Sequence, residues 1–155
     1  MTKRIESDSS VQQELEGAIL QKFLEKNNIT GIESNNNLLP LTNNPKVKIK
    51  PDFYSEEQHI IGEIHAHLGK LKPAQVRKVA TDVLKMLMFE KDYGEEFTKY
   101  IVVCDEEEEK QLKGDSYLAE AITQYKIKVD CVDLSEKEKE KLEEAMKSQN
   151  LFKYE

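Results

Sequence analysis

The sequence predicts an α/β protein in which a mixed β-sheet is flanked by helices on both faces. Short apolar runs with strand periodicity alternate with longer segments of helical periodicity, and the two central strand segments are separated only by a short turn. A turn of that length gives antiparallel pairing, whereas a strand–helix–strand crossover gives parallel pairing. The 155 residues are enough for one buried core and too few for two. Residues 10–155 are therefore expected to form a single domain, after a disordered lead-in over residues 1–9.

The composition limits the classes of function. The net charge is −7, which argues against bulk, non-specific affinity for nucleic acid. No run approaches the roughly 20 apolar residues that span a bilayer, and no apolar segment follows the charged N-terminus, so neither a membrane span nor a secretory signal is expected. Cys104 and Cys131 lie within apolar runs, which favours reduced thiols in a cytoplasmic protein. A bridge between them is the alternative, if their strands are neighbours.

Each element of the first half has its own signal in the sequence. Behind a serine N-cap, apolar residues recur every three or four positions, which predicts a helix. An Asn-rich stretch without periodicity then predicts a long loop, and two alternating segments separated by four residues predict a β-hairpin. The expected elements are a helix over about residues 10–26, a short strand at 38–41 within the loop, and strands at 46–54 and 59–68.

The second half is expected to alternate between helices and strands. Pro73 is typical of a first helical turn, and the apolar run before Cys104 is typical of a central strand. Ser135 and Glu138 have the spacing of a capping box, which predicts the start of the last helix. The acidic run 105–110 is expected to be the solvated start of a helix. The expected elements are a helix over about residues 73–92, a strand at 99–104, a helix around 117–125, a strand at 127–132 and a helix over about 135–149.

The strand that follows the predicted turn carries the residues best suited to chemistry. Because side chains alternate along a strand, Glu63, His65 and His67 are expected on one face. Burying them without partners would cost several kcal/mol, so they either face solvent or line a site. Asp52 ends the preceding strand, and the hairpin is expected to bring it close to Glu63. Two carboxylates there, with room for water, suit Mg²⁺ better than Zn²⁺.

The order and spacing of these residues resemble a known family. Asp52 follows a proline, and Glu63 and His65 follow on the next strand, after an opening helix and before a long one. This pattern resembles the PD-(D/E)XK superfamily of restriction-endonuclease-like phosphodiesterases. The resemblance covers about residues 10–105. It implies an αβββαβ core of the restriction-endonuclease type, to which the C-terminal strand and helix are an addition.

The resemblance also implies roles for individual residues. Asp52 and Glu63 would bind Mg²⁺ or Mn²⁺, and an acidic residue of the first helix would join them. Glu16 is the better match for that residue, because apolar residues follow it at the spacing that packs the helix on the sheet. Glu14 is the competitor.

His65 stands at the position of the family's lysine. A neutral imidazole could orient or deprotonate the attacking water near neutral pH, but it lacks the permanent charge of a lysine. In variants of the family the lysine lies on a neighbouring element, so Lys70, Lys72 or Lys78 could supply it. These three lysines, together with Gln75 early in the next helix, are also the expected contacts to nucleic acid.

Three alternatives stand beside this interpretation. Asp52 could simply initiate a turn after its proline. Glu63 and His65 could be a solvent-exposed pair on an edge strand. His59, His65 and His67 lie within nine residues, a spacing that also permits a transition-metal site.

The function predicted from these residues is a Mg²⁺-dependent phosphodiesterase, a nuclease that acts on DNA or RNA. A catalytically silent nuclease fold, serving as a binding or assembly module, is the competing prediction. The missing motif lysine and the low positive charge favour that second class. No membrane partner is expected, and a homodimer is left open as the state of assembly.

Overall fold

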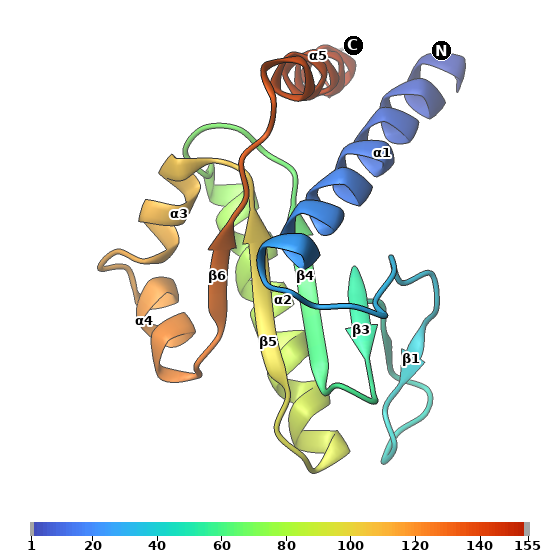
Figure 1. Cartoon of the computed structure of the whole chain (residues 1–155), viewed down its shortest axis with the longest axis vertical. Helices are drawn as coiled ribbons and strands as arrows, with labels where there is room; N and C mark the ends of the chain where they lie inside the picture. The colour runs from blue at the N-terminus through green and yellow to red at the C-terminus, as the bar shows by residue number, and fades with distance from the viewer. Residues whose placement is uncertain (1, 154–155) are drawn as a thin grey trace.

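The computed structural model describes the backbone of residues 2–153 and the side chains of residues 10–148. Within this part of the chain, five helices flank a mixed four-stranded sheet, and two short strands form a separate ribbon (Figure 1). The helices are α1 (Thr2–Lys26), α2 (Pro73–Tyr93), α3 (Glu106–Leu112), α4 (Tyr117–Gln124) and α5 (Glu136–Lys153). The strands are β1 (Leu39–Pro40), β2 (Lys48–Ile49), β3 (Phe53–Ser55), β4 (Ile60–His65), β5 (Thr98–Val103) and β6 (Lys128–Cys131). The predicted α/β class and mixed sheet are confirmed.

The four-stranded sheet has the order β3-β4-β5-β6. β3 pairs with β4 in the antiparallel sense, whereas β4, β5 and β6 are parallel. β4 therefore lies between two strands and has no free edge. None of the helices in the described part of the chain is both long and apolar enough to cross a membrane.

The segment predicted as one strand over residues 46–54 is divided in the structure. Lys48–Ile49 pairs with β1, and only Phe53–Ser55 pairs with β4. Pro51 lies between the two pieces and has no N–H to donate to a ladder, which accounts for the break. The hairpin prediction is confirmed for the last part of that segment and wrong for the first.

The first helix is longer than predicted, because α1 begins at Thr2, ahead of the predicted start. The lead-in expected to be disordered, residues 1–9, lies outside the residues whose side chains are described.

Two of the helices in the second half begin at the predicted signals, Pro73 and the capping box of Ser135, and the structure adds the other caps. α2 begins with Pro73 and ends at Gly94, whose φ of 88° is the left-handed conformation that favours glycine. α3 and α4 are separate helices with the caps Asp105 and Ser116. The capping box that starts α5 is confirmed. The hydroxyl of Ser135 accepts from the backbone N–H of Glu138, and the carboxylate of Glu138 accepts from the backbone N–H of Ser135.

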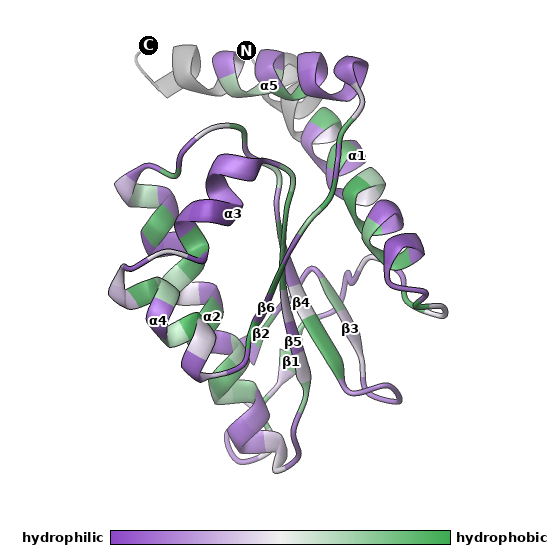
Figure 2. Cartoon of the chain, turned by 60° about the vertical axis from the view of Figure 1, so that its left-hand side comes forward, coloured by the Kyte–Doolittle hydropathy of each residue, from purple (hydrophilic) through white to green (hydrophobic). Residues whose placement is uncertain are grey.

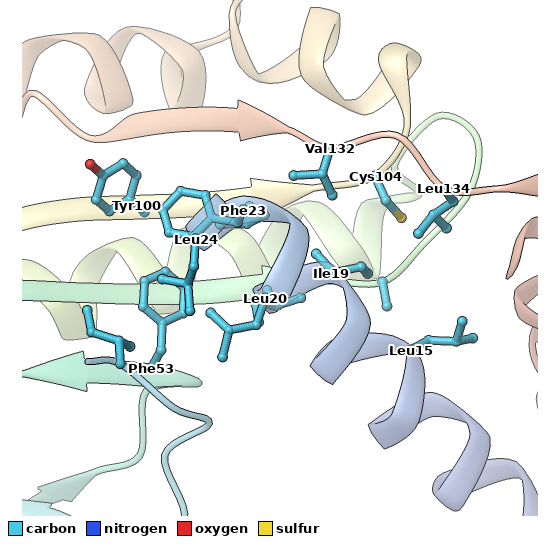
Figure 3. Close-up of a cluster of buried hydrophobic side chains, with 14 of the residues drawn as sticks. Leu15, Ile19, Leu20, Phe23, Leu24, Phe53, Tyr100, Cys104, Val132 and Leu134 are labelled. Carbon is cyan, nitrogen blue, oxygen red and sulfur yellow. The ribbon is translucent and has the colours of Figure 1, made fainter. Parts of the chain in front are cut away.

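Each face of the sheet carries its own apolar core. α1 lies against one face, with α5 packed on α1 beyond the ends of the strands, and α2, α3 and α4 cover the other face (Figure 2). Side chains alternate along β4, so Ile64 belongs to the core under α1 and Ile61 to the core under α2. The core under α1 and α5 includes Leu15, Ile19, Phe23, Phe53, Tyr100, Cys104 and Leu134 (Figure 3). The core under the other three helices includes Val79, Val83, Met86, Phe89, Ile101, Leu118 and Ile122.

Phe53 determines how closely β3 can approach β4. It pairs with Gly62, and its ring occupies the space where a side chain at position 62 would begin. The same ring lies against Phe23, with centroids 5.3 Å apart, and Phe23 in turn packs edge-on against Tyr100 at 4.7 Å. The aromatic cluster therefore holds β3, β4, β5 and α1 together at one point.

Both cysteines are free thiols in neighbouring strands. Cys104 is buried just after β5, and burial raises the pKa of its thiol to about 12. Cys131 ends β6 and is partly exposed, and burial raises its pKa to about 11. The prediction of reduced thiols is confirmed, and the alternative of a bridge between them is wrong for this structure.

A Gly62→Ala substitution tests the contact of the Phe53 ring with the backbone. The new methyl group would displace the ring from the aromatic cluster, so we expect a loss of about 1–3 kcal/mol in the free energy of unfolding. Chemical denaturation measures the change. Gly17→Ala is the matched control, because a methyl group there meets no other atom within 4 Å and alanine favours a helix. Equal midpoints for Gly62→Ala and the wild type would contradict the role of this contact.

Candidate active site

The pairing of β3 with β4 places Asp52 against the middle of β4. Its Oδ2 accepts a hydrogen bond of 2.7 Å from the backbone N–H of Ile64, and its backbone oxygen accepts one of 2.8 Å from Asn35. The Asn35 amide also donates to the carbonyl of Pro51 at 2.9 Å. The carboxylate of Asp52 is thus used across the sheet and not to initiate a local turn, which overturns that alternative.

Glu63 and His65 are buried in the central strand β4, with exposed fractions of 9% and 6%. They lie on the face that α2 covers, as their alternation with Ile64 requires. The alternative of a solvent-exposed edge pair is therefore wrong.

Four carboxyl groups are linked through their charges at this point: Asp52 acts on Glu16 of α1 and on Glu63, and Asp82 of α2 also acts on Glu63. We call them the carboxylate cluster. Burial, then the charges of Asp52 and Asp82, and then a hydrogen bond to Asp52 raise the pKa of Glu63 to about 10. Burial, followed by the charge of Asp52, also raises the pKa of Glu16. The structure therefore brings together the three predicted acidic residues and adds Asp82, whereas Glu14 is exposed and takes no part.

The lysines that were candidates for the missing motif residue differ in position. The positive charge of Lys78 lowers the pKa of both Glu16 and Glu63, against the stronger effects that raise them. Lys70 and Lys72 are exposed before α2 and exert no such effect. Of the three, Lys78 is the one that the structure brings to the carboxylate cluster. It lies one helical turn before Asp82 on the same face of α2.

His65 is held by α2. Its Nε2 is 3.1 Å from Oδ2 of Asp82, with both side chains 10% exposed or less. This is an ion-pair distance, but the alignment is poor, and Nε2 has no hydrogen-bond partner among the described residues. Sequence reasoning missed Asp82, although a signal was present: it falls on the buried stripe of α2 with Val79, Val83 and Met86, where a charged residue needs a reason.

The other two histidines have separate partners. Nδ1 of His67 is 2.8 Å from Oε1 of Glu108 in α3, and Nε2 of His59 is 3.0 Å from Glu95 at the opposite end of β4. A site formed by His59, His65 and His67 is therefore wrong. Glu108 is fully buried, so the expectation that the acidic run is solvated is also wrong at this residue.

Gln75 has a local role in the structure. Its Oε1 accepts a hydrogen bond of 2.8 Å from the backbone N–H of Lys72, which satisfies a free donor at the start of α2. The structure thus uses its acceptor for capping, away from the carboxylate cluster.

A cavity of about 750 Å³ lies elsewhere, between α3 and α5 at the carboxyl ends of β5 and β6. None of the carboxylate cluster lines it. We place the candidate site at the cluster and not in this cavity, because perturbed carboxyl groups with a charged neighbour are typical of functional sites. Among the described residues, no group of three or more His, Cys, Asp or Glu side chains is arranged to hold a metal ion.

The fold and the cluster define the chain as an α/β protein with a buried carboxylate pair at the join of an antiparallel and a parallel strand. Comparisons with protein-family models, with curated proteins and with solved structures each found no match.

Replacement of Glu63 by Gln tests the electrostatics of the site. The folded protein holds Glu63 protonated at neutral pH, whereas the unfolded chain releases that proton above a pKa of 4.5. The contribution of Glu63 to stability is thus fully present below pH 4.5 and is lost as pH rises toward 10. We expect metal-free Glu63→Gln to be more stable than the wild type by about 3 kcal/mol at pH 7, and by nothing at pH 4.

Urea unfolding across this pH range, with a chelator present, measures the difference. Glu14→Gln is the control, because Glu14 is an exposed carboxylate of α1. A Glu63→Gln curve parallel to the wild-type curve at every pH would show that Glu63 is ionised in the folded protein.

Proposed function

We propose that this chain is a Mg²⁺-dependent phosphodiesterase of nuclease type that acts on nucleic acid. The observation that carries the proposal is the placement of Asp52, directly before β3, beside Glu63 of β4. The carboxylate of Asp52 accepts from the N–H of Ile64, next to Glu63, and the charges of Asp52 and Lys78 both act on Glu63. The order of elements agrees with the PD-(D/E)XK superfamily in part, since α1 precedes the hairpin of β3 and β4, which α2 and β5 follow. It departs from the αβββαβ core of that superfamily before β3, where the chain forms the separate ribbon β1-β2 in place of a further strand of the main sheet.

The donor set fits a hard divalent cation. Mg²⁺ is commonly bound through one or two carboxylates and keeps several waters, so Asp52 and Glu63 suffice as protein ligands. The charge of Asp52 acts on Glu16, but Glu16 forms no three-residue metal group with this pair among the described residues. Burial is the largest cause of the raised pKa of Glu63, and the charges of Asp52 and Asp82 come next. A bound cation would offset this second, repulsive part. When bound, such a cation polarises a phosphate and lowers the pKa of a water molecule.

The chain's own residues would supply the rest of the site. Lys78 would place a permanent positive charge beside the negative charge that develops on the phosphate, the task that the family's lysine performs. Asp82 would hold the ring of His65 in one orientation against α2. In this proposal His65 is a structural partner of the site, and Lys78 replaces it in the role suggested by the sequence.

A silent binding or assembly module is the second candidate. Two observations favour it: the described residues include no three-residue metal group, and the imidazole that replaces the motif lysine is engaged with Asp82. Metal affinity separates the candidates, because a silent module needs none.

Asp52→Asn tests the proposed ligand. We expect the wild type to cleave single- or double-stranded DNA or RNA with Mg²⁺ or Mn²⁺, and the variant to lose on the order of 10²-fold or more in rate. Calorimetry should show Mn²⁺ binding to the wild type and not to the variant. The Glu14→Gln protein serves as the control for an acidic residue outside the cluster. Absence of both cleavage and metal binding in the wild type would favour the silent module.

Comparison of Lys78→Ala with His65→Ala tests which residue replaces the motif lysine. We expect Lys78→Ala to reduce the cleavage rate by about 10²-fold, with Lys78→Arg retaining part of it, because the required property is a positive charge. Lys85→Ala on the same helix is the control. If instead His65→Ala is the inactive variant and Lys78→Ala keeps the wild-type rate, the role belongs to His65.

A further inference from the structure

The loop that joins β4 to α2 is attached along its length to α3 and its cap. Asp105, which caps α3, and Glu108 and Gln111 of α3 are spaced three residues apart. They contact Gly69, His67 and Leu71 of the loop, and we call this set of contacts the clamp. The contacts are Gly69 N to Asp105 Oδ2 at 3.0 Å, His67 Nδ1 to Glu108 Oε1 at 2.8 Å, and Leu71 N to Gln111 Oε1 at 2.8 Å. Gln111 also donates through Nε2 to the carbonyl of Leu71 at 3.4 Å.

The clamp joins one face of α3 to a bent loop. Residues three apart on a helix share a face. The loop bends at Gly69, whose φ is 84°, and His67, Gly69 and Leu71 contact that face out of sequence order. Leu71 is 5% exposed and belongs to the core under α2, so the clamped side of the loop faces the protein. Lys70, which lies between Gly69 and Leu71, and Lys72, which follows Leu71, are both exposed.

Glu108 is the buried centre of the clamp. It is fully buried, its Oε1 contacts His67, and its Oε2 has no hydrogen-bond partner among the described residues. A buried carboxyl group with a free oxygen costs stability. Asp105 contributes twice, because its Oδ1 caps α3 through Glu107 N at 2.8 Å while its Oδ2 holds the loop.

The clamped loop connects two elements of the candidate active site. It leaves β4 just after Glu63 and His65, and it enters the helix that carries Lys78 and Asp82. A lysine on an ordered backbone loses less conformational entropy when it binds a phosphate than a lysine on a mobile loop.

We propose that α3, through Asp105, Glu108 and Gln111, is the positioning element that presents Lys70 and Lys72 to the sugar–phosphate backbone of a nucleic acid at the carboxylate cluster. This inference rests on the proposed function and extends it, since it names which lysines bind the strand beside the site and what orders them. The acidic run that contains Glu108 then has a role in binding a polyanion, by fixing the cations that make the contact.

Gln111→Leu tests the clamp, since it removes both contacts to Leu71 and keeps the volume of the side chain. The first measurement is hydrogen exchange in the protein alone. We expect faster exchange at the amide of Gly69, whose own acceptor Asp105 is unchanged, if the clamp acts as a unit. Gln111→Glu, which keeps the acceptor for Leu71 N, should restore most of the protection. Lys110→Gln, an exposed residue of the same helix, is the control. Unchanged protection of Gly69 in Gln111→Leu overturns the clamp.

The second measurement is binding of a DNA oligonucleotide at several salt concentrations with Ca²⁺ or a chelator in place of Mg²⁺. The double variant Lys70→Ala, Lys72→Ala should weaken binding and reduce the log–log salt slope by about 2, because two phosphate contacts are lost. Gln111→Leu should weaken binding about 3- to 10-fold with an unchanged slope, because both charges are still present. Wild-type affinity in Gln111→Leu, or in the double variant, overturns the inference and leaves the proposed nuclease function standing. Absence of any binding by the wild type to DNA or RNA overturns both.

Discussion

The contact between the ring of Phe53 and the backbone of Gly62 is the constraint on which the candidate site depends. Because position 62 has no side chain, β3 approaches β4 with an aromatic ring between them, and the same ring joins the core under α1. This register places the residue before Phe53 beside Glu63, so that Asp52 can accept from Ile64 N. α1 packs on the same aromatic cluster and carries Glu16 to the same place. Hydrophobic packing on one face thus determines where the carboxylates meet.

The carboxylate cluster gathers acidic groups where burial opposes their charged forms. The pKa of Glu63 is raised to about 10 and that of Glu16 is also raised, and burial is the first cause for both. Neighbouring packing must hold such a site together, since its electrostatics oppose the fold. Proteins tolerate such sites where they serve a function. The carboxylate cluster is therefore the candidate site, in preference to the cavity between α3 and α5.

Most of the fold could be predicted from periodicity and capping, whereas the errors have specific physical causes. The alternation in residues 46–54 is continuous, and only the missing N–H of Pro51 reveals that two strands share it. The closeness of Asp52 and Glu63 could be predicted, because strand alternation and hairpin pairing are local features of a sequence. The position of Asp82 and Lys78 at the cluster could not be predicted in the same way. Residues on one face of a helix contribute to a site only when tertiary packing places that face against a strand. Glu108 looked like its three acidic neighbours, and nothing in a run of identical residues marks the one that is buried.

One of the two thiols provides the protein with an internal reporter of opening. Alkylation and oxidation require a thiolate, and pKa values of about 12 for Cys104 and about 11 for Cys131 leave almost none at neutral pH in the closed state. Cys104 lies at the end of β5, next to the residue that caps α3, whereas Cys131 ends the outer strand β6. Because Cys104 is buried and Cys131 is partly exposed, the rate at which Cys104 reacts with a small alkylating reagent is the one that measures a free energy of opening. Slow alkylation of Cys104 would show that the end of β5, next to the cap of α3, stays closed.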